Sequence, residues 1–322
     1  MKKLITFTSI VGLGLFLAAC GSDNGATSSS SSAAVESDSD IKIVTTFYPM
    51  YEFTKQVVGD SAEVELMIPA GTEPHDYEPS AKDIANIVDA DAFVYNSDEF
   101  ETWVSDISEN IDTQQTAVIQ AADGIELMEG AEEEHDHETE ESHEEEHSHE
   151  LDPHVWLSPV LAAQEVETIQ AALSEKYPEL ADTFAENAEN YIAELNALDE
   201  EYTTALADAT ERTFVTQHAA FGYLARQYDL TQVAISGISP DEEPSASRLA
   251  ELKDYVDENG IQYIYFEENA SSTVAETLAS EANVETLVLN PLESLTTEQL
   301  DNGEDYISVM QENLSALQKT IQ

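Results

Sequence analysis

Strand-like and helix-like segments alternate twice along this chain, in two blocks separated by a long helical region. β-branched and aromatic runs predict four strands in each block, with helical patterns between them. The predicted strands are residues 41–48, 63–68, 92–95 and 117–120, then 213–217, 232–235, 262–266 and 285–289. Strands separated by helices form parallel sheets. The pattern therefore predicts an α/β fold with two similar lobes, each built on a mainly parallel four-stranded sheet.

The region between the blocks carries helical rather than strand periodicity. Ser158 and Pro159 are typical of a helix start, and Tyr177-Pro178 breaks that helix. Apolar residues then recur at three- and four-residue steps from Leu180 to Leu206, which predicts one helix of roughly 28 residues, about 42 Å long. We expect this helix to bridge an N-terminal lobe (41–130) and a C-terminal lobe (211–322), within a linking region at 151–210.

The first 40 residues resemble an export and anchoring segment. Lys2 and Lys3 precede an apolar run that is shorter than the ~20 residues of a spanning helix. The run ends in Leu-Ala-Ala-Cys20, which resembles the lipobox of bacterial lipoprotein signal peptides. The resemblance implies a signal peptide at 1–19, a lipid on Cys20 and a protein held at the extracellular face of the cell membrane. The Ser-rich stretch 20–40 is expected to be a flexible tether.

The composition restricts the possible partners. The chain has 67 acidic and 11 basic residues, a formal net charge of −56, and a single cysteine. Binding nucleic acid requires clustered Lys and Arg, so we expect no nucleic-acid partner. One cysteine excludes an intramolecular disulfide and a site made of two thiolates.

Three of the eight histidines stand in separate segments beside predicted strand ends or helix starts: His75, His154 and His218. In open α/β sheets, ligands bind beyond the carboxyl ends of the strands, so loops from both lobes are expected to meet in one cleft. Three imidazoles and one carboxylate make a tetrahedral zinc site. Glu293, just past the last predicted strand, is the favoured carboxylate, and Glu267 and Glu268 are weaker alternatives.

The other five histidines crowd an acidic tract at residues 131–150: His135, His137, His143, His147 and His149. One interpretation is an auxiliary segment that holds zinc weakly and passes it to the cleft or senses its excess. The other is an acidic loop without a role in transport, and composition alone leaves both open. The run His143-Glu-Glu-Glu-His147 matches the zinc-protease pattern by chance, because no apolar residue is present to pack such a helix.

Four segments resemble one protein family. They are GTEPHDYEPS (71–80), DPHVWLSP (152–159), HAAFGY (218–223) and NPLESL (290–295). In this order they resemble the zinc-specific substrate-binding lipoproteins of bacterial ABC metal importers. The resemblance spans residue 41 to the C-terminus. It implies zinc held between two lobes by His75, His154, His218 and Glu293, and delivered to a membrane permease driven by a cytosolic ATPase.

Three other functions remain open at this stage. A zinc hydrolase needs an open coordination position and a base, for which Glu73 or Glu78 could serve. A manganese receptor is a closer alternative, although the manganese branch of the family has a carboxylate where this chain has His218. A surface adhesin leaves no signature in the sequence. We expect a monomeric receptor without enzymatic activity.

Deleting residues 132–150 tests the role of the tract. A segment without fixed geometry binds zinc weakly, so the deletion is expected to remove only weak sites. One tight site and the thermal stabilisation by one equivalent of zinc should remain, because stabilisation follows binding to the folded state. Zinc titration by calorimetry checks this expectation. Loss of the tight site would identify a tract histidine as a true ligand.

Overall fold

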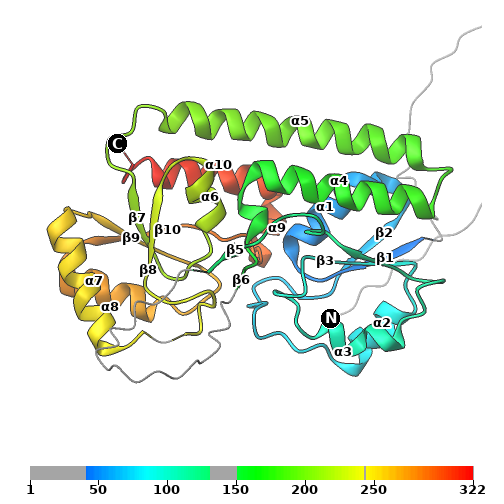
Figure 1. The fold of residues 1–322 in the computed structure, drawn as a ribbon, viewed down its shortest axis with the longest axis horizontal. Coiled ribbons are helices and arrows are strands. Elements are labelled where there is room, and N and C mark those ends of the chain that lie inside the picture. The colour runs from blue at the N-terminus through cyan, green and yellow to red at the C-terminus, as the bar shows by residue number, and fades with distance from the viewer. Residues whose placement is uncertain (1–40, 131–150, 243, 322) are drawn as a thin grey trace, which may run out of the picture. The chain divides into compact units, whose positions relative to one another are not determined.

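The N-terminal lobe is a parallel four-stranded sheet in the order β2-β1-β3-β4 (Figure 1). In this computed structural model, the described residues are 41–130, 151–242 and 244–321. The strands are β1 Lys42–Thr45, β2 Glu63–Leu66, β3 Ala92–Tyr95 and β4 Ala117–Gln120, and the helices are α1 Tyr48–Val58, α2 Ala81–Val88 and α3 Val104–Ile107. Helix α3 is short and passes into a single 3-10 turn at Ser108–Asn110.

The C-terminal lobe repeats this architecture, with a parallel sheet in the order β10-β9-β7-β8. Its strands are β7 Thr213–Thr216, β8 Thr231–Ala234, β9 Tyr263–Phe266 and β10 Glu285–Val288. Its helices are α6 Gly222–Gln227, α7 Ala246–Asn259, α8 Thr273–Ala282, α9 Thr297–Asn302 and α10 Tyr306–Leu317. The sequence pattern did not predict α9. The predicted fold class, two parallel four-stranded sheets in an α/β fold, is confirmed.

Two long helices flank the sheets: α5 Ala181–Leu206 runs alongside both lobes, and α4 Pro159–Lys176 lies over the N-terminal lobe, against α1 and β4 (Figure 1). Helix α5 buries the predicted apolar face, from Phe184 to Leu206, against α1 and α10. The hydroxyl of Tyr202 donates to the carbonyl of Met310 in α10 at 2.6 Å. The predicted bridging helix is therefore present, two residues shorter than expected, and it packs on elements of both lobes.

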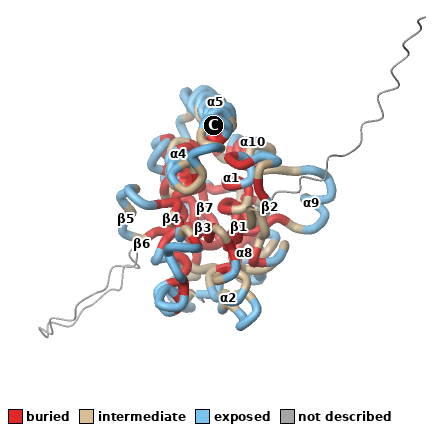
Figure 2. The backbone as a smooth tube through the Cα atoms, turned by 90° about the vertical axis from the view of Figure 1, so that its right-hand side faces the viewer, coloured by how far each residue is buried: buried red, intermediate tan, exposed pale blue. Residues whose placement is uncertain are grey.

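The main hydrophobic core extends through both lobes and under these two helices. Figure 2 shows the strands within the buried interior and the outer side of α5 exposed. A second, smaller core lies in the C-terminal lobe around Leu252, Ile264 and Leu278. Within the described residues, no helix is long and apolar enough to span a bilayer.

A short antiparallel hairpin, which the sequence did not predict, lies between the lobes. It pairs β5 Met128–Glu129 with β6 Leu151–Asp152. Strands of two residues carry no periodic pattern, so only the folded chain reveals them. The predicted tract at 131–150 connects the two strands and lies outside the described residues, as do the predicted signal peptide, Cys20 and the tether.

The structure also contains an unusual buried acid. Glu165 on α4 is fully buried, and within the described part of the chain neither of its carboxyl oxygens has a hydrogen-bond partner. Burial, with the neighbouring charge of Glu101, raises the pKa of Glu165 well above 4.5. An acid whose pKa is raised by folding destabilises the folded state as the pH rises above the pKa of the unfolded chain.

We expect Glu165→Gln to stabilise the metal-free protein at neutral pH and to have little effect in acid. The advantage should grow by about 1.4 kcal/mol per pH unit above the unfolded pKa, until the pH reaches the folded pKa. Urea unfolding at several pH values measures this difference. Glu167→Gln, an exposed site on the same helix, is the control. An advantage that does not depend on pH would contradict a buried, protonated Glu165.

Candidate metal centre

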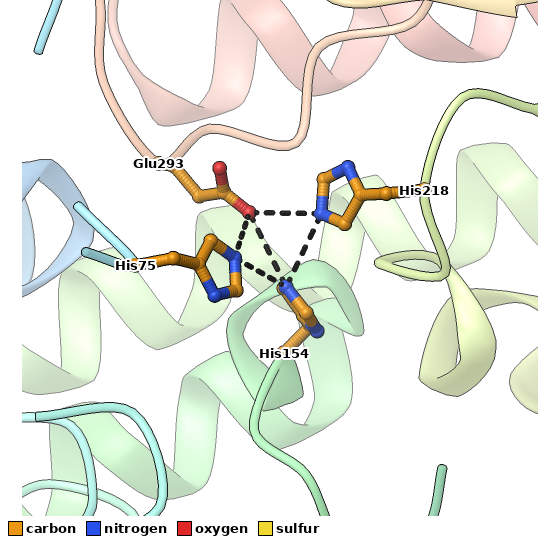
Figure 3. Close-up of side chains that lie close together, drawn as sticks. All are labelled: His75, His154, His218 and Glu293. Carbon is orange, nitrogen blue, oxygen red and sulfur yellow. Dashed lines mark hydrogen bonds and ion pairs between the residues drawn. The ribbon is translucent and has the colours of Figure 1, made fainter. Parts of the chain in front are cut away.

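The four predicted ligands meet in the space between the lobes (Figure 3). His75 lies in the loop after β2, His154 follows β6, His218 follows β7 and Glu293 follows β10. The side chains of His154 and His218 are completely buried, and those of Glu293 and His75 are 4% and 9% exposed. Segments far apart in the sequence therefore supply one enclosed cluster, at the strand ends where the sequence predicted it.

The spacing of the ligand atoms fits a tetrahedral metal ion. Oε1 of Glu293 lies 3.3 Å from Nε2 of His75 and 3.2 Å from Nε2 of both His154 and His218. Nε2 of His154 lies 3.3 Å from that of His75 and 3.4 Å from that of His218. Zinc bonds of about 2.0–2.1 Å in a regular tetrahedron require ligand atoms about 3.3 Å apart. Five of the six separations between ligand atoms agree with this value and all six lie within 4.8 Å, so the cluster can hold an ion of the size of zinc.

Carboxylates stand behind two of the imidazoles. Nδ1 of His154 lies 2.8 Å from Oδ1 of Asp152, and Nδ1 of His218 lies 2.5 Å from Oε1 of Glu267. These contacts leave both Nε2 atoms free to face the centre of the cluster. Glu267, the weaker candidate ligand in the sequence, is thus placed behind His218 rather than in the ligand set. No role of Asp152 was apparent from the sequence, although Asp152 stands two residues before His154.

The remaining candidate carboxylates lie apart from the four-residue cluster. Glu268 is exposed on the outer side of its loop, as is Glu78. Glu73 accepts a hydrogen bond from the backbone N–H of His75 at 2.9 Å. Burial, together with the negative charge of Glu293, raises the pKa of Glu73 to about 8.

The loop that carries Glu293 is held by side chains from distant elements. Nε1 of Trp156 donates to the carbonyl of Pro291 at 2.8 Å, next to the ligand loop's tightest turn. Leu292 has a φ of 59°, a left-handed conformation that is costly for a branched residue, and its N–H donates to the side chain of Asn290. Asn313 of α10 bonds the backbone N–H and C=O of Asn290. These contacts fix the position of Glu293.

The His75 loop is attached to the same region. The N–H of Gly71 donates to Oγ of Ser294 at 2.8 Å, and Asn269 donates to the carbonyl of Ser294 at 2.7 Å. The ring of Phe100 packs edge-on against His75, with ring centres 4.9 Å apart. Phe100 is buried, so it forms an apolar wall beside the ligands. The contact between Gly71 and Ser294 could not be predicted from the sequence, because it depends on the two lobes meeting.

The electrostatics of the cluster favour a cation. Burial lowers the pKa of His218, but the carboxylates of Glu267 and Glu293 outweigh it and raise the pKa well above 6.5. The pKa of His154 is also raised, because hydrogen bonds to Asp152 and Glu293 outweigh burial. Burial lowers the pKa of His75, and the surrounding histidines hold that of Glu293 well below 4.5 despite its burial. In the metal-free site, protons on His154 and His218 therefore supply the positive charge that balances the carboxylates.

The chain matches known zinc-uptake proteins along most of its length. The family model described as zinc-uptake complex component A, periplasmic (ZnuA) matches residues 43–320. The zinc-binding lipoprotein AdcA of Streptococcus pneumoniae serotype 4 is 55% identical over 320 residues, which cover 99% of this chain but 61% of that relative. The high-affinity zinc uptake system protein ZnuA of Bacillus subtilis is 50% identical over 308 residues, covering 95% of this chain and 94% of the relative. The chain thus spans about three-fifths of the length of the AdcA relative.

Solved structures agree with this relationship. The Zn(II)-bound ZnuA-like domain of Streptococcus pneumoniae AdcA is 54% identical and superposes with a TM-score of 0.75, covering 87% of this chain and 98% of that domain. The laminin-binding protein Lmb of Streptococcus agalactiae, described as having adhesin and metal-transporting activity, is 34% identical with a TM-score of 0.74 and covers 88% of this chain and all of that one. By fold, by sequence and by the residues gathered at its centre, the chain belongs to the zinc-uptake complex component A family.

Proposed function

We propose that this protein is an extracellular receptor that captures Zn²⁺ in the cleft between its lobes and delivers it to an ABC permease for high-affinity uptake. The observation that carries the proposal is the enclosed cluster of His75, His154, His218 and Glu293, in which five of the six separations between ligand atoms are 3.2–3.4 Å. In this proposal zinc is cargo: the protein binds it outside the cell and releases it to the permease, which a cytosolic ATPase drives.

The donor set supports zinc over manganese. Three imidazoles suit zinc, whereas manganese favours oxygen ligands in an octahedral shell. His218 is therefore the residue that most clearly separates the two cargoes.

The same geometry argues against a zinc hydrolase. A catalytic zinc keeps a position open for water, but four protein ligands complete a tetrahedral shell here. Glu73 is bonded to the backbone of His75, and Glu78 is exposed to solvent. Neither is arranged as a general base beside an open coordination position.

We further propose that the mature chain begins at Cys20, carries a lipid there and works as a monomer at the outer face of the cell membrane, with residues 41–130 and 211–322 as its two lobes. The lipobox-like sequence and the AdcA relative's description as a lipoprotein support this proposal. An adhesin role is a secondary candidate that rests on the Lmb description alone.

Replacing ligands one at a time should rank their contributions. His154→Ala and His218→Ala are expected to weaken zinc binding strongly, at least 100-fold, because each also leaves a buried carboxylate without its partner. His75→Ala should also weaken binding strongly. Glu293→Ala should cost less, because water can take the fourth position.

Competition with a chromophoric chelator, in a background lacking residues 132–150, measures these affinities. Glu268→Ala, at an exposed carboxylate outside the cluster, is the control and should bind zinc like the parent. Unchanged affinity in His218→Ala would remove the main argument for zinc over manganese.

The pH dependence of binding follows from the protons that zinc must displace. Because the pKa values of His154 and His218 are raised, proton competition is expected to begin above the ordinary histidine value of about 6.5 and to strengthen as the pH falls. Apparent affinity should therefore decline from mildly alkaline to mildly acidic pH, with more than one proton taken up per zinc released. Titrations across this range with a pH-stat give both quantities. A flat affinity would exclude a three-histidine site.

A further inference from the structure

The hairpin between the lobes connects the C-terminal lobe to His154, the ligand supplied by the linking region. Tyr223 of α6 accepts a hydrogen bond from the N–H of Met128 at 2.8 Å and donates its hydroxyl proton to the carbonyl of Asp152 at 2.7 Å. Its ring is buried in a small core with Ala122 and Val155. One tyrosine hydroxyl thus joins both strands of the hairpin that leads into His154.

Asp152 links the hairpin to the ligand His154 by two contacts. Its Oδ1 accepts from the backbone N–H of His154 at 2.9 Å and lies 2.8 Å from Nδ1 of the same residue. A neutral imidazole carries one proton, so a proton on Nδ1 leaves the lone pair of Nε2 for a metal. A carboxylate at this position therefore sets both the tautomer and the orientation of the ring.

Gly222 makes room for that carboxylate. A Cβ atom at Gly222 would lie 2.7 Å from Oδ2 of Asp152 and 3.3 Å from the terminal methyl of Met128. Both neighbours are the ends of side chains, so an alanine here would displace the carboxylate rather than the backbone. Because Gly222 of α6 has no side chain, the carboxylate of Asp152 in the linking region has room to lie against it.

We propose that Gly222 and Tyr223 are positioning residues for zinc binding, which act on His154 across the lobe boundary through Asp152. The run HAAFGY then has two roles in one segment. His218 is itself a ligand. Gly222 and Tyr223, four and five residues later, position the carboxylate of Asp152, which orients the second ligand, His154. This inference rests on the proposed zinc site and adds a mechanism by which the C-terminal lobe controls the ligand supplied by the linking region.

Non-additive losses of zinc affinity test the proposal in the full chain. Asp152→Ala, Gly222→Ala and Tyr223→Phe are each expected to weaken the tight site about 10- to 100-fold, the usual effect of losing a group that orients a metal-bound histidine. If Gly222 and Tyr223 act through the carboxylate, combining either substitution with Asp152→Ala should cost no more than about a further twofold. Competition with a chelator strong enough to strip weak sites measures each affinity.

A matched control comes from the other end of the same helix. Tyr228→Phe also removes a hydroxyl that makes a hydrogen bond, here to Asp199 rather than to the described strands of the hairpin. It should keep the affinity of the parent. A loss like that of Tyr223→Phe would mean that general loosening of α6 is responsible, and would overturn the proposal.

A spectroscopic reading separates orientation from simple structural support. Nitrogen NMR of the metal-free, histidine-labelled protein at alkaline pH reports the tautomer of His154, assigned by the signal lost in His154→Gln. We expect the Nδ1–H form in the parent and a shift toward the Nε2–H form in Asp152→Ala and Gly222→Ala. An unchanged tautomer, unchanged affinity in Gly222→Ala, or losses that multiply in the Asp152→Ala background would each overturn the inference. A parent chain without a tight zinc site would instead contradict the proposed function as well.

Discussion

Three buried carboxylates surround three buried imidazoles at the centre of this protein, and the rest of the fold holds them there. Asp152, Glu267 and Glu293 are almost completely removed from solvent. Buried anions are tolerated only when they are paired with positive charge and hydrogen bonded. In the metal-free state that charge comes from protons on His154 and His218, and a divalent cation can replace it. The site is therefore a buried negative cavity that favours a cation, and its three imidazoles are ligands that suit zinc.

Holding such groups together requires rigid support from both lobes. The two parallel sheets bring the ligand loops to the same region, and α5 packs on α1 and α10 alongside them. Closer to the site, Trp156, Asn313 and Tyr223 bond the loops to distant elements. Leu292 has a left-handed backbone conformation, which costs free energy. Such local strain persists only where surrounding contacts hold the residue in place, as they do in this loop. Metal affinity is thus a property of the whole two-lobed frame.

The sequence predicted the parts that depend on local pattern. Strand and helix periodicity gave two sheets, and the apolar face from Phe184 to Leu206 gave the bridging helix. His75, His218 and Glu293 follow predicted strands and His154 precedes a predicted helix, so the rule that ligands gather beyond the carboxyl ends of parallel strands predicted that these residues would meet. The hairpin β5–β6, the role of Asp152 and the space above Gly222 could not be predicted in this way. Each depends on contacts between residues far apart in the chain, and a glycine or an aspartate alone does not reveal which partner it faces.

The central claim is that the fold holds a tetrahedral site of three imidazoles and one carboxylate for a single zinc ion. X-ray absorption spectroscopy of the protein loaded with one equivalent of zinc tests it most directly. The account predicts four nitrogen and oxygen ligands at about 2.0–2.1 Å, with the outer-shell scattering of three imidazole rings. A five- or six-coordinate shell dominated by oxygen, or scattering from fewer than three imidazoles, would contradict it.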